Sequence, residues 1–201
     1  MSGPLRLVLA TANPHKATEI RSILAAAGLD VDLRPRPPEV PEVVEDADTL
    51  EGNARLKAVA LAAATGLPAL ADDTGLEVDA LGGRPGVRSA RYAGDDGDAG
   101  RNVAKVLAEM AAVRRASRTA RFRTVALARW PDGRELVAAG TVEGTIAEAP
   151  EGTGGFGYDP VFRPAGGRGL TMAQLTPAEK DAISHRGRAV RALAALLVAE
   201  P

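Results

Sequence analysis

The sequence contains no cysteine, which excludes disulfide bonds, thiolate nucleophiles and thiolate metal sites. It has no apolar run of the roughly 20 residues that would span a bilayer, and no signal-peptide pattern follows Met1. The formal net charge of −1 gives no electrostatic reason to expect a nucleic acid or an anionic membrane as a partner. We therefore expect a cytoplasmic protein that binds neither nucleic acid nor membrane.

Lysine and aromatic residues are both scarce. Of the 25 basic residues only four are lysine, at positions 16, 57, 105 and 180. In a chain this rich in arginine, a remaining lysine is a candidate for a position that needs a compact ammonium group, although chance alone would also leave a few. The aromatic residues are three Phe, two Tyr and one Trp, so any aromatic residue in a flexible loop is a candidate for base stacking.

Apolar residues recur at strand and helix spacing along the whole chain. Strands are predicted at Leu5–Ala10, Val31–Leu33, Ala69–Ala71, Phe122–Trp130 and Leu136–Ala147. Helices are predicted from Pro14 to Gly28, at Leu50–Thr65, at Ala99–Ala112 and in the C-terminal part after Thr176. The alternation predicts an α/β fold, and a hairpin through Pro131-Asp132-Gly133 adds an antiparallel pair. We expect one domain over residues 1–201, with a mixed central sheet flanked by helices.

A strand-to-helix turn follows the first strand and reads Thr11-Ala12-Asn13-Pro14-His15-Lys16. Asn13 suits the helix N-cap and Pro14 the first helical position. The amides and dipole of such an N-terminus attract phosphate, and Lys16 adds a positive charge. A purely structural cap is the more frequent use of this pattern, and the absence of a glycine-rich run before the lysine excludes a P-loop.

An acidic pair in Asp72-Asp73-Thr74-Gly75 follows the third predicted strand. Ligands of open α/β sheets bind at the carboxyl ends of strands, and an aspartate there can hold Mg²⁺ together with substrate phosphates. Because successive strand side chains alternate in direction, only one of the pair is expected to enter a site, with Asp72 supporting the turn. A simple Asp-Gly turn is equally compatible with the pattern.

An acidic loop precedes the second predicted helix and contains Glu42, Glu45, Asp46 and Asp48. It predicts either a solvated surface or a second carboxylate for the same metal. A glycine-rich segment, Gly152 to Gly157, contains G-x-G-x-x-G, but Tyr158-Asp159-Pro160 follows instead of a helix, which excludes dinucleotide binding. Phe156 in this segment and Tyr158 just after it are candidates for base stacking or for anchoring the loop.

A basic cluster near the C-terminus contains Lys180, His185 and Arg186 within seven residues. Such side chains can donate hydrogen bonds to carbonyl and phosphate oxygens, or they can cap the last helix.

These segments, in this order, resemble the inosine/xanthosine triphosphate pyrophosphatase family, also called HAM1-like. The resemblance runs nearly from end to end and also includes Asn53-Ala54 with Lys57 and Ser89-Ala90-Arg91-Tyr92. Two positions depart from the family pattern: Thr74 replaces a common serine, and Gly52 replaces the glutamate that commonly precedes Asn53.

The resemblance implies two lobes with a substrate cleft between them, a homodimer and a requirement for Mg²⁺. It implies hydrolysis of ITP, dITP and XTP to the monophosphate and pyrophosphate, with Asp73 as the catalytic acidic residue and Glu45 and Asp73 as metal ligands. The substrate-binding residues that it implies are Thr11, Ala12, Asn13, Pro14, His15, Lys16, Thr74, Phe156, Gly157, Tyr158, Asp159, Lys180, His185 and Arg186.

Other functions are compatible with parts of the sequence. A Maf-like pyrophosphatase for modified pyrimidine nucleotides is the nearest enzymatic alternative. A non-catalytic nucleotide-binding module is another, but it would gain little from an acidic pair beside a triphosphate.

Overall fold

The computed structural model describes residues 4–199. Its strands are β1 Leu5–Leu9, β2 Val31–Arg34, β3 Ala69–Val78, β4 Pro85–Gly86, β5 Thr119–Arg129, β6 Glu135–Ile146 and β7 Phe162–Pro164. Its α-helices are α1 Pro14–Ala26, α2 Leu50–Thr65, α3 Ala99–Glu109, α4 Pro177–Ile183 and α5 His185–Ala199. No helix within these residues is long and apolar enough to cross a membrane.

The strands form one mixed sheet in the order β2-β1-β3-β5-β6-β7, with β4 paired to β3. Strand β1 is parallel to both β2 and β3, whereas β4 and β7 run antiparallel to β3 and β6. Helices connect the parallel strands, and a tight turn closed by the Trp130 amide on the Arg134 carbonyl joins β5 to β6. The predicted mixed α/β sheet is confirmed.

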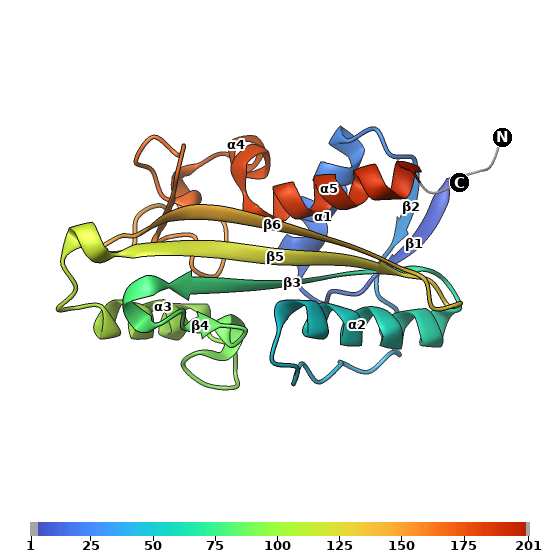
Figure 1. The fold of residues 1–201 in the computed structure, drawn as a ribbon, viewed down its shortest axis with the longest axis horizontal. Helices are drawn as coiled ribbons and strands as arrows, with labels where there is room; N and C mark the ends of the chain where they lie inside the picture. Colours follow the sequence, from blue (N-terminus) through green and yellow to red (C-terminus); the bar gives the residue numbers. More distant parts are fainter. Residues whose placement is uncertain (1–3, 200–201) are drawn as a thin grey trace. The chain divides into compact units, whose positions relative to one another are not determined.

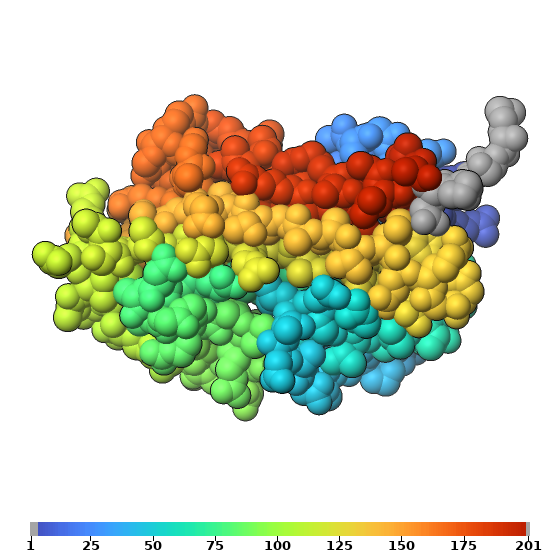
Figure 2. All heavy atoms as spheres, in the orientation of Figure 1, coloured from blue at the N-terminus to red at the C-terminus, as the bar shows by residue number. Residues whose placement is uncertain are grey.

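The chain divides into two compact units that share β3, β5 and β6. The first unit contains the described residues up to Asp73, together with Thr124–Gly140 and the residues from Arg186 onward. Figure 1 shows α1 and α5 on one side of its strands and α2 on the other. Ile20 of α1 and Leu193 of α5 pack with Leu7 of β1 and Leu70 of β3 in a buried core. The face drawn in Figure 2 shows α5 open to solvent along one side.

The second unit consists of Thr74–Arg123 and Thr141–His185. Its core contains Val106 and Met110 from the end of α3, packed with Leu76, Phe122 and Phe162 from the strands. Helices α3 and α4 lie on opposite sides of the strands (Figure 1). Each unit therefore has its own hydrophobic core. The single domain and the cleft between lobes stay predictions.

One prediction about the third strand was wrong. Strand β3 does not end at Ala71 but continues to Val78, so the acidic pair lies inside the strand and forms no turn. The neighbouring strand β1, in contrast, pairs only with Ala69 and Leu70. Asp72 and Asp73 therefore lie just beyond the carboxyl end of β1, where β3 no longer pairs with it. The predicted position at the end of a strand is thus set by β1 and not by β3.

Candidate active site

The two adjacent aspartates of β3 point to opposite faces of the sheet, as alternating strand side chains must. Asp73 bonds to residues of α2, whereas Asp72 bonds to residues of α1 and α5. Both are almost completely buried. The prediction that only one of the pair enters the active site stays a prediction. Asp73 shares Lys57 with Glu45. Asp72 pairs with Lys16 and Arg186 and supports no turn.

Asp73 lies in a cluster built by helix α2 and the acidic loop. The Lys57 ammonium is 3.3 Å from Asp73 Oδ1 and 3.0 Å from Glu45 Oε2. The Asn53 amide donates to Asp73 Oδ2 at 3.3 Å, and its oxygen accepts from the Ala47 amide. Asn53 and Lys57 are four residues apart and so share one face of α2. The loop is thus held with Glu45 turned inward, while Glu42, Asp46 and Asp48 are exposed.

Asp72 lies in a second cluster on the other face. Its Oδ2 is 3.2 Å from the Lys16 ammonium and 3.2 Å from Arg186 Nε. The Arg186 guanidinium also pairs with Glu19 of α1. The side chain of Arg186 is only 1% exposed, and that of Asp72 is fully buried. Such deeply buried charges persist only when each has a partner of opposite sign.

The turn before α1 has the predicted geometry. Asn13 Oδ1 accepts from the amides of His15 and Lys16, which confirms the N-cap, and the Thr11 hydroxyl accepts from the Asn13 amide. Pro14 occupies the first helical position. Ala12, Pro14 and His15 are exposed, and the other three residues of the segment are half-buried. Their predicted role in substrate binding stays a prediction.

The electrostatics of the two aspartates differ. Burial raises the pKa of Asp73, although Lys57 and Lys16 oppose that rise. Burial also favours the neutral form of Asp72, but Lys16 and Arg186 outweigh it and hold the pKa of that carboxyl well below its usual range. A raised carboxyl pKa is typical of a group that accepts a proton in a reaction, whereas a lowered one is typical of a permanent counter-ion. Asp73 is therefore the better candidate for a base.

The donor set around Lys57 fits Mg²⁺. Glu45 and Asp73 both contact the same ammonium group, so two carboxylates converge on one cationic position. Within residues 4–199 no group of three or more His, Cys, Asp or Glu side chains is arranged to hold a metal. Mg²⁺ is usually held by one or two carboxylates, with substrate phosphates and water as the remaining ligands, so two carboxylates suffice. In this cluster two carboxylates face one ammonium group, an arrangement that suits a divalent cation.

The second unit holds the glycine-rich segment and Lys180. The Lys180 ammonium lies 2.6 Å from Asp159 Oδ2 and 4.6 Å from the centre of the Phe156 ring. Asp159 Oδ2 also accepts from the Phe156 amide at 2.8 Å. The loop is thereby fastened around one buried ion pair, with Phe156 and Gly157 left half-exposed. The structure thus brings Phe156 and Asp159 together with Lys180, and their contact with substrate stays a prediction.

The remaining predicted residues are placed as follows. Tyr158 is buried, and its hydroxyl donates to the Ser89 carbonyl at 2.9 Å. His185 is buried and stacks on Phe122, with ring centres 4.5 Å apart. Thr74 is half-buried in β3. Lys180 and His185 belong to the second unit and Arg186 to the first, and the role of the three in substrate binding stays a prediction.

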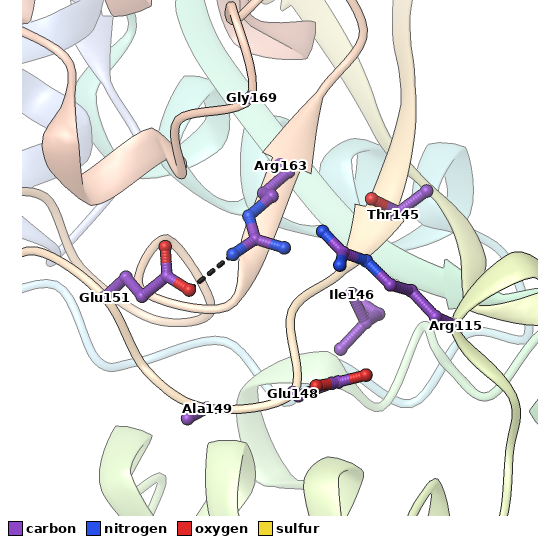
Figure 3. Close-up of a pocket in the computed structure, with 8 residues that line it drawn as sticks. All are labelled: Arg115, Thr145, Ile146, Glu148, Ala149, Glu151, Arg163 and Gly169. Atoms are coloured by element: carbon purple, nitrogen blue, oxygen red, sulfur yellow. Dashed lines mark hydrogen bonds and ion pairs between the residues drawn. The ribbon is translucent and has the colours of Figure 1, made fainter.

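A pocket of about 510 Å³ opens in the second unit away from these residues. Arg115, Glu148, Glu151 and Arg163 line it, and Figure 3 shows Arg163 paired with Glu151. Its two arginines and two glutamates balance in charge, and in the described part of the chain none of the residues predicted from the sequence lines it. It offers no carboxylate pair comparable to Glu45 and Asp73.

Sequence reasoning did not assign roles to three residues of these clusters, Glu19, Asn53 and Lys57, and it assigned Asp72 only to a turn. Two signals pointed to Lys57 and Asn53. Lys57 is one of only four lysines, and both residues are polar positions spaced for one face of an alanine-rich helix. No feature of the local sequence indicated that Glu19 takes part in a cluster.

The chain was compared with known proteins. The sequence profile of the Ham1 family matches residues 7–196. The chain belongs to the Ham1 family. A relative from Streptomyces coelicolor is 53% identical over 190 residues, covering 94% of each chain, and is named dITP/XTP pyrophosphatase. Another of the same name, from Symbiobacterium thermophilum, is 54% identical over 92% of this chain and 91% of its own.

Solved structures of the Ham1 family share this fold. A HAM1 protein from Coxiella burnetii superposes with a TM-score of 0.87 at 39% identity, covering 98% of this chain and all of its own. A nucleoside-triphosphatase, dITP/XTP pyrophosphatase, from Mycobacterium abscessus gives 0.74 at 44% identity, covering 95% of this chain and 97% of its own. The family identified by resemblance is confirmed.

Proposed function

We propose that this protein hydrolyses non-standard purine nucleoside triphosphates, namely dITP, ITP and XTP, to the monophosphate and pyrophosphate. The observation that carries the proposal is the buried Asp73, which shares Lys57 with Glu45. This arrangement supports a reaction that needs a base and a cation site together. Membership of the Ham1 family, whose relatives are named dITP/XTP pyrophosphatases, supports the same substrates.

In the proposed reaction Asp73 accepts a proton from a water molecule that attacks the α-phosphorus. Its pKa, raised by burial, brings it closer to the operating pH than that of an exposed aspartate, which favours this role. Asn53 and Lys57 hold its two oxygens and so fix the direction of the carboxylate. Lys16 stabilises negative charge on the phosphates.

Glu45 and Asp73 would hold Mg²⁺. When bound, the ion would offset negative charge on the triphosphate and on the departing pyrophosphate.

We assign recognition of the base to residues of the second unit. Phe156 lies half-exposed on a glycine-rich loop, as a stacking platform requires, and Lys180 lies over its ring. His185 is a candidate donor to the 6-oxo group that distinguishes hypoxanthine and xanthine from adenine. A donor that a wrong base leaves unpaired is a strong basis for rejection.

We further propose a cytoplasmic homodimer in which residues 1–201 form one functional domain.

The substrate panel ITP, dITP, XTP, ATP, GTP and a modified pyrimidine triphosphate, each with Mg²⁺, tests the proposal. We expect kcat/KM for the first three to exceed that for ATP by at least about 100-fold, because adenine lacks the 6-oxo group that the donor requires. We also expect GTP to be a poor substrate, because a pocket hostile to exocyclic amines would exclude its 2-amino group. Preference for the modified pyrimidine would instead support a Maf-like activity. Equal turnover of ATP would refute the assignment.

A further inference from the structure

The fully buried Asp72 joins two basic residues that come from distant parts of the sequence. Its Oδ2 lies 3.2 Å from the Lys16 ammonium of α1 and 3.2 Å from Arg186 Nε of α5. Lys16 is 16% exposed and Arg186 only 1%, so neither cation is well solvated by bulk water. One carboxylate is therefore the counter-ion of two desolvated basic side chains.

The network closes through helix α1. Arg186 pairs with Glu19, and Glu19 follows Lys16 by three residues, so both lie on the same face of the helix. Lys16, Asp72, Arg186 and Glu19 thus form a chain of alternating charges that connects α1, β3 and α5 and has both of its ends on α1.

This arrangement matters for Lys16 because its ammonium sits on a flexible four-carbon stem. A lysine that contacts only a mobile phosphate would have to lose its side-chain freedom when the substrate binds. Asp72 removes much of that freedom in advance. Asp72 lies on the face of β3 opposite Asp73, and its Oδ2 contacts Lys16 and Arg186.

We propose that Asp72 is a positioning residue that pre-orders Lys16 and Arg186, and thereby acts on the reaction without touching the substrate. This inference rests on the proposed function for its kinetic consequence. Its structural consequence, an ordered Lys16 ammonium, is independent of the substrate.

A double-mutant cycle tests the kinetic consequence, with dITP and XTP as substrates. Asp72→Asn keeps the size of the side chain and removes its charge, and Lys16→Gln removes the ammonium. We expect Asp72→Asn to lower kcat/KM by about 100-fold in the natural background, as misplacement of a substrate-binding group does. In the Lys16→Gln background the same change should have a clearly smaller effect, because only the action of Asp72 through Arg186 remains. Losses that multiply in full would overturn the proposal.

Glu135→Gln is the matched control. Glu135 is also a carboxylate of the first unit that holds two basic side chains, Arg55 and Arg129. A merely structural role for Asp72 would lower thermal stability and activity in both variants alike. We expect kcat/KM to fall only in Asp72→Asn, and an equal fall in the control would refute a specific role.

NMR of the lysine ammonium groups tests the structural consequence without substrate. The chain has only four lysines, so Lys16 can be assigned by the loss of one signal in Lys16→Gln. The Lys16 ammonium should be ordered in the natural protein and in Glu135→Gln, and mobile in Asp72→Asn. An unchanged order parameter in Asp72→Asn would overturn the inference.

If Asp72→Asn folds poorly, the NMR measurement can be made on Glu19→Gln instead. That change removes the other carboxylate of the network and should loosen the Lys16 ammonium to a smaller degree. If the natural protein releases no pyrophosphate from dITP or XTP, the proposed function fails, while the NMR result still decides the positioning of Lys16.

Discussion

Removal of the Asp159 charge should destabilise the second unit strongly, because it leaves the Lys180 ammonium buried without its counter-ion. The two side chains are 5% and 6% exposed, and their charged atoms are 2.6 Å apart. At that distance and an effective dielectric constant of about 20, their attraction is about 6 kcal/mol before the cost of desolvation is counted. Breaking one half of such a pair typically costs about 3–5 kcal/mol.

The loss in the free energy of unfolding has an upper bound. At pH 7 an unpaired Lys180 can lose its proton, which costs about 5 kcal/mol for a lysine of ordinary pKa. We therefore expect Asp159→Asn, which keeps an oxygen to accept from the Phe156 amide, to lower the free energy of unfolding by about 3–5 kcal/mol. The double variant Asp159→Asn with Lys180→Met should lose less than Asp159→Asn alone, because no charge stays buried.

The measurement is urea unfolding followed by two spectroscopic signals. The only tryptophan, Trp130, belongs to the first unit, whereas Tyr92 and Tyr158 belong to the second. The loss should appear in the tyrosine signal, and any independent unfolding of the units would separate the two curves. Single-variant losses below about 1 kcal/mol, or a double variant whose loss equals the sum of the single ones, would refute the reasoning.

Three further predictions follow from the same structure. Asp73→Asn should lower kcat for dITP by about 100- to 10,000-fold without unfolding the protein, measured as pyrophosphate release, and a near-normal rate would remove Asp73 from the role of base. Chelation of divalent cations with EDTA should abolish turnover, and added Mg²⁺ should restore it; activity that persists in EDTA would exclude the metal requirement. Burial, with a hydrogen bond to Glu109, raises the pKa of Tyr92 to about 12, and burial raises that of Tyr158 as well. Because the folded state favours the neutral phenols, the two tyrosines contribute to the free energy of unfolding. This contribution is fully present below pH ~10 and is lost as the pH rises towards 12. Absorbance at tyrosinate wavelengths should therefore stay low until about pH 11, and ionisation of both tyrosines near pH 10 in the folded protein would contradict it.

Local features of this chain were predictable from sequence. The cap at Asn13 depends on residues two and three positions away, and the structure has it as expected. The spacing of Thr176-Pro177-Ala178-Glu179 in the sequence also indicates a capping box, and the structure contains it. Helix and strand periodicities predicted most elements because apolar spacing alone determines which face is buried.

The charged clusters were less predictable. Asp72 and Asp73 look like turn residues in the sequence, and only their partners explain how a buried strand tolerates them. Arg186 lies 114 positions from Asp72 and 167 from Glu19, so no local pattern indicates these pairs. The ordered motifs of the family predicted Glu45 and Asp73, but only the fold shows that the Lys57 ammonium contacts both carboxylates.

Hydrolysis of dITP in ¹⁸O-labelled water, followed by mass spectrometry of both products, tests the central claim most directly. Attack on the α-phosphorus places one labelled oxygen in the nucleoside monophosphate and none in the pyrophosphate. We predict this distribution for dITP and for XTP. Label in the pyrophosphate, or release of orthophosphate in place of pyrophosphate, would contradict the proposed reaction.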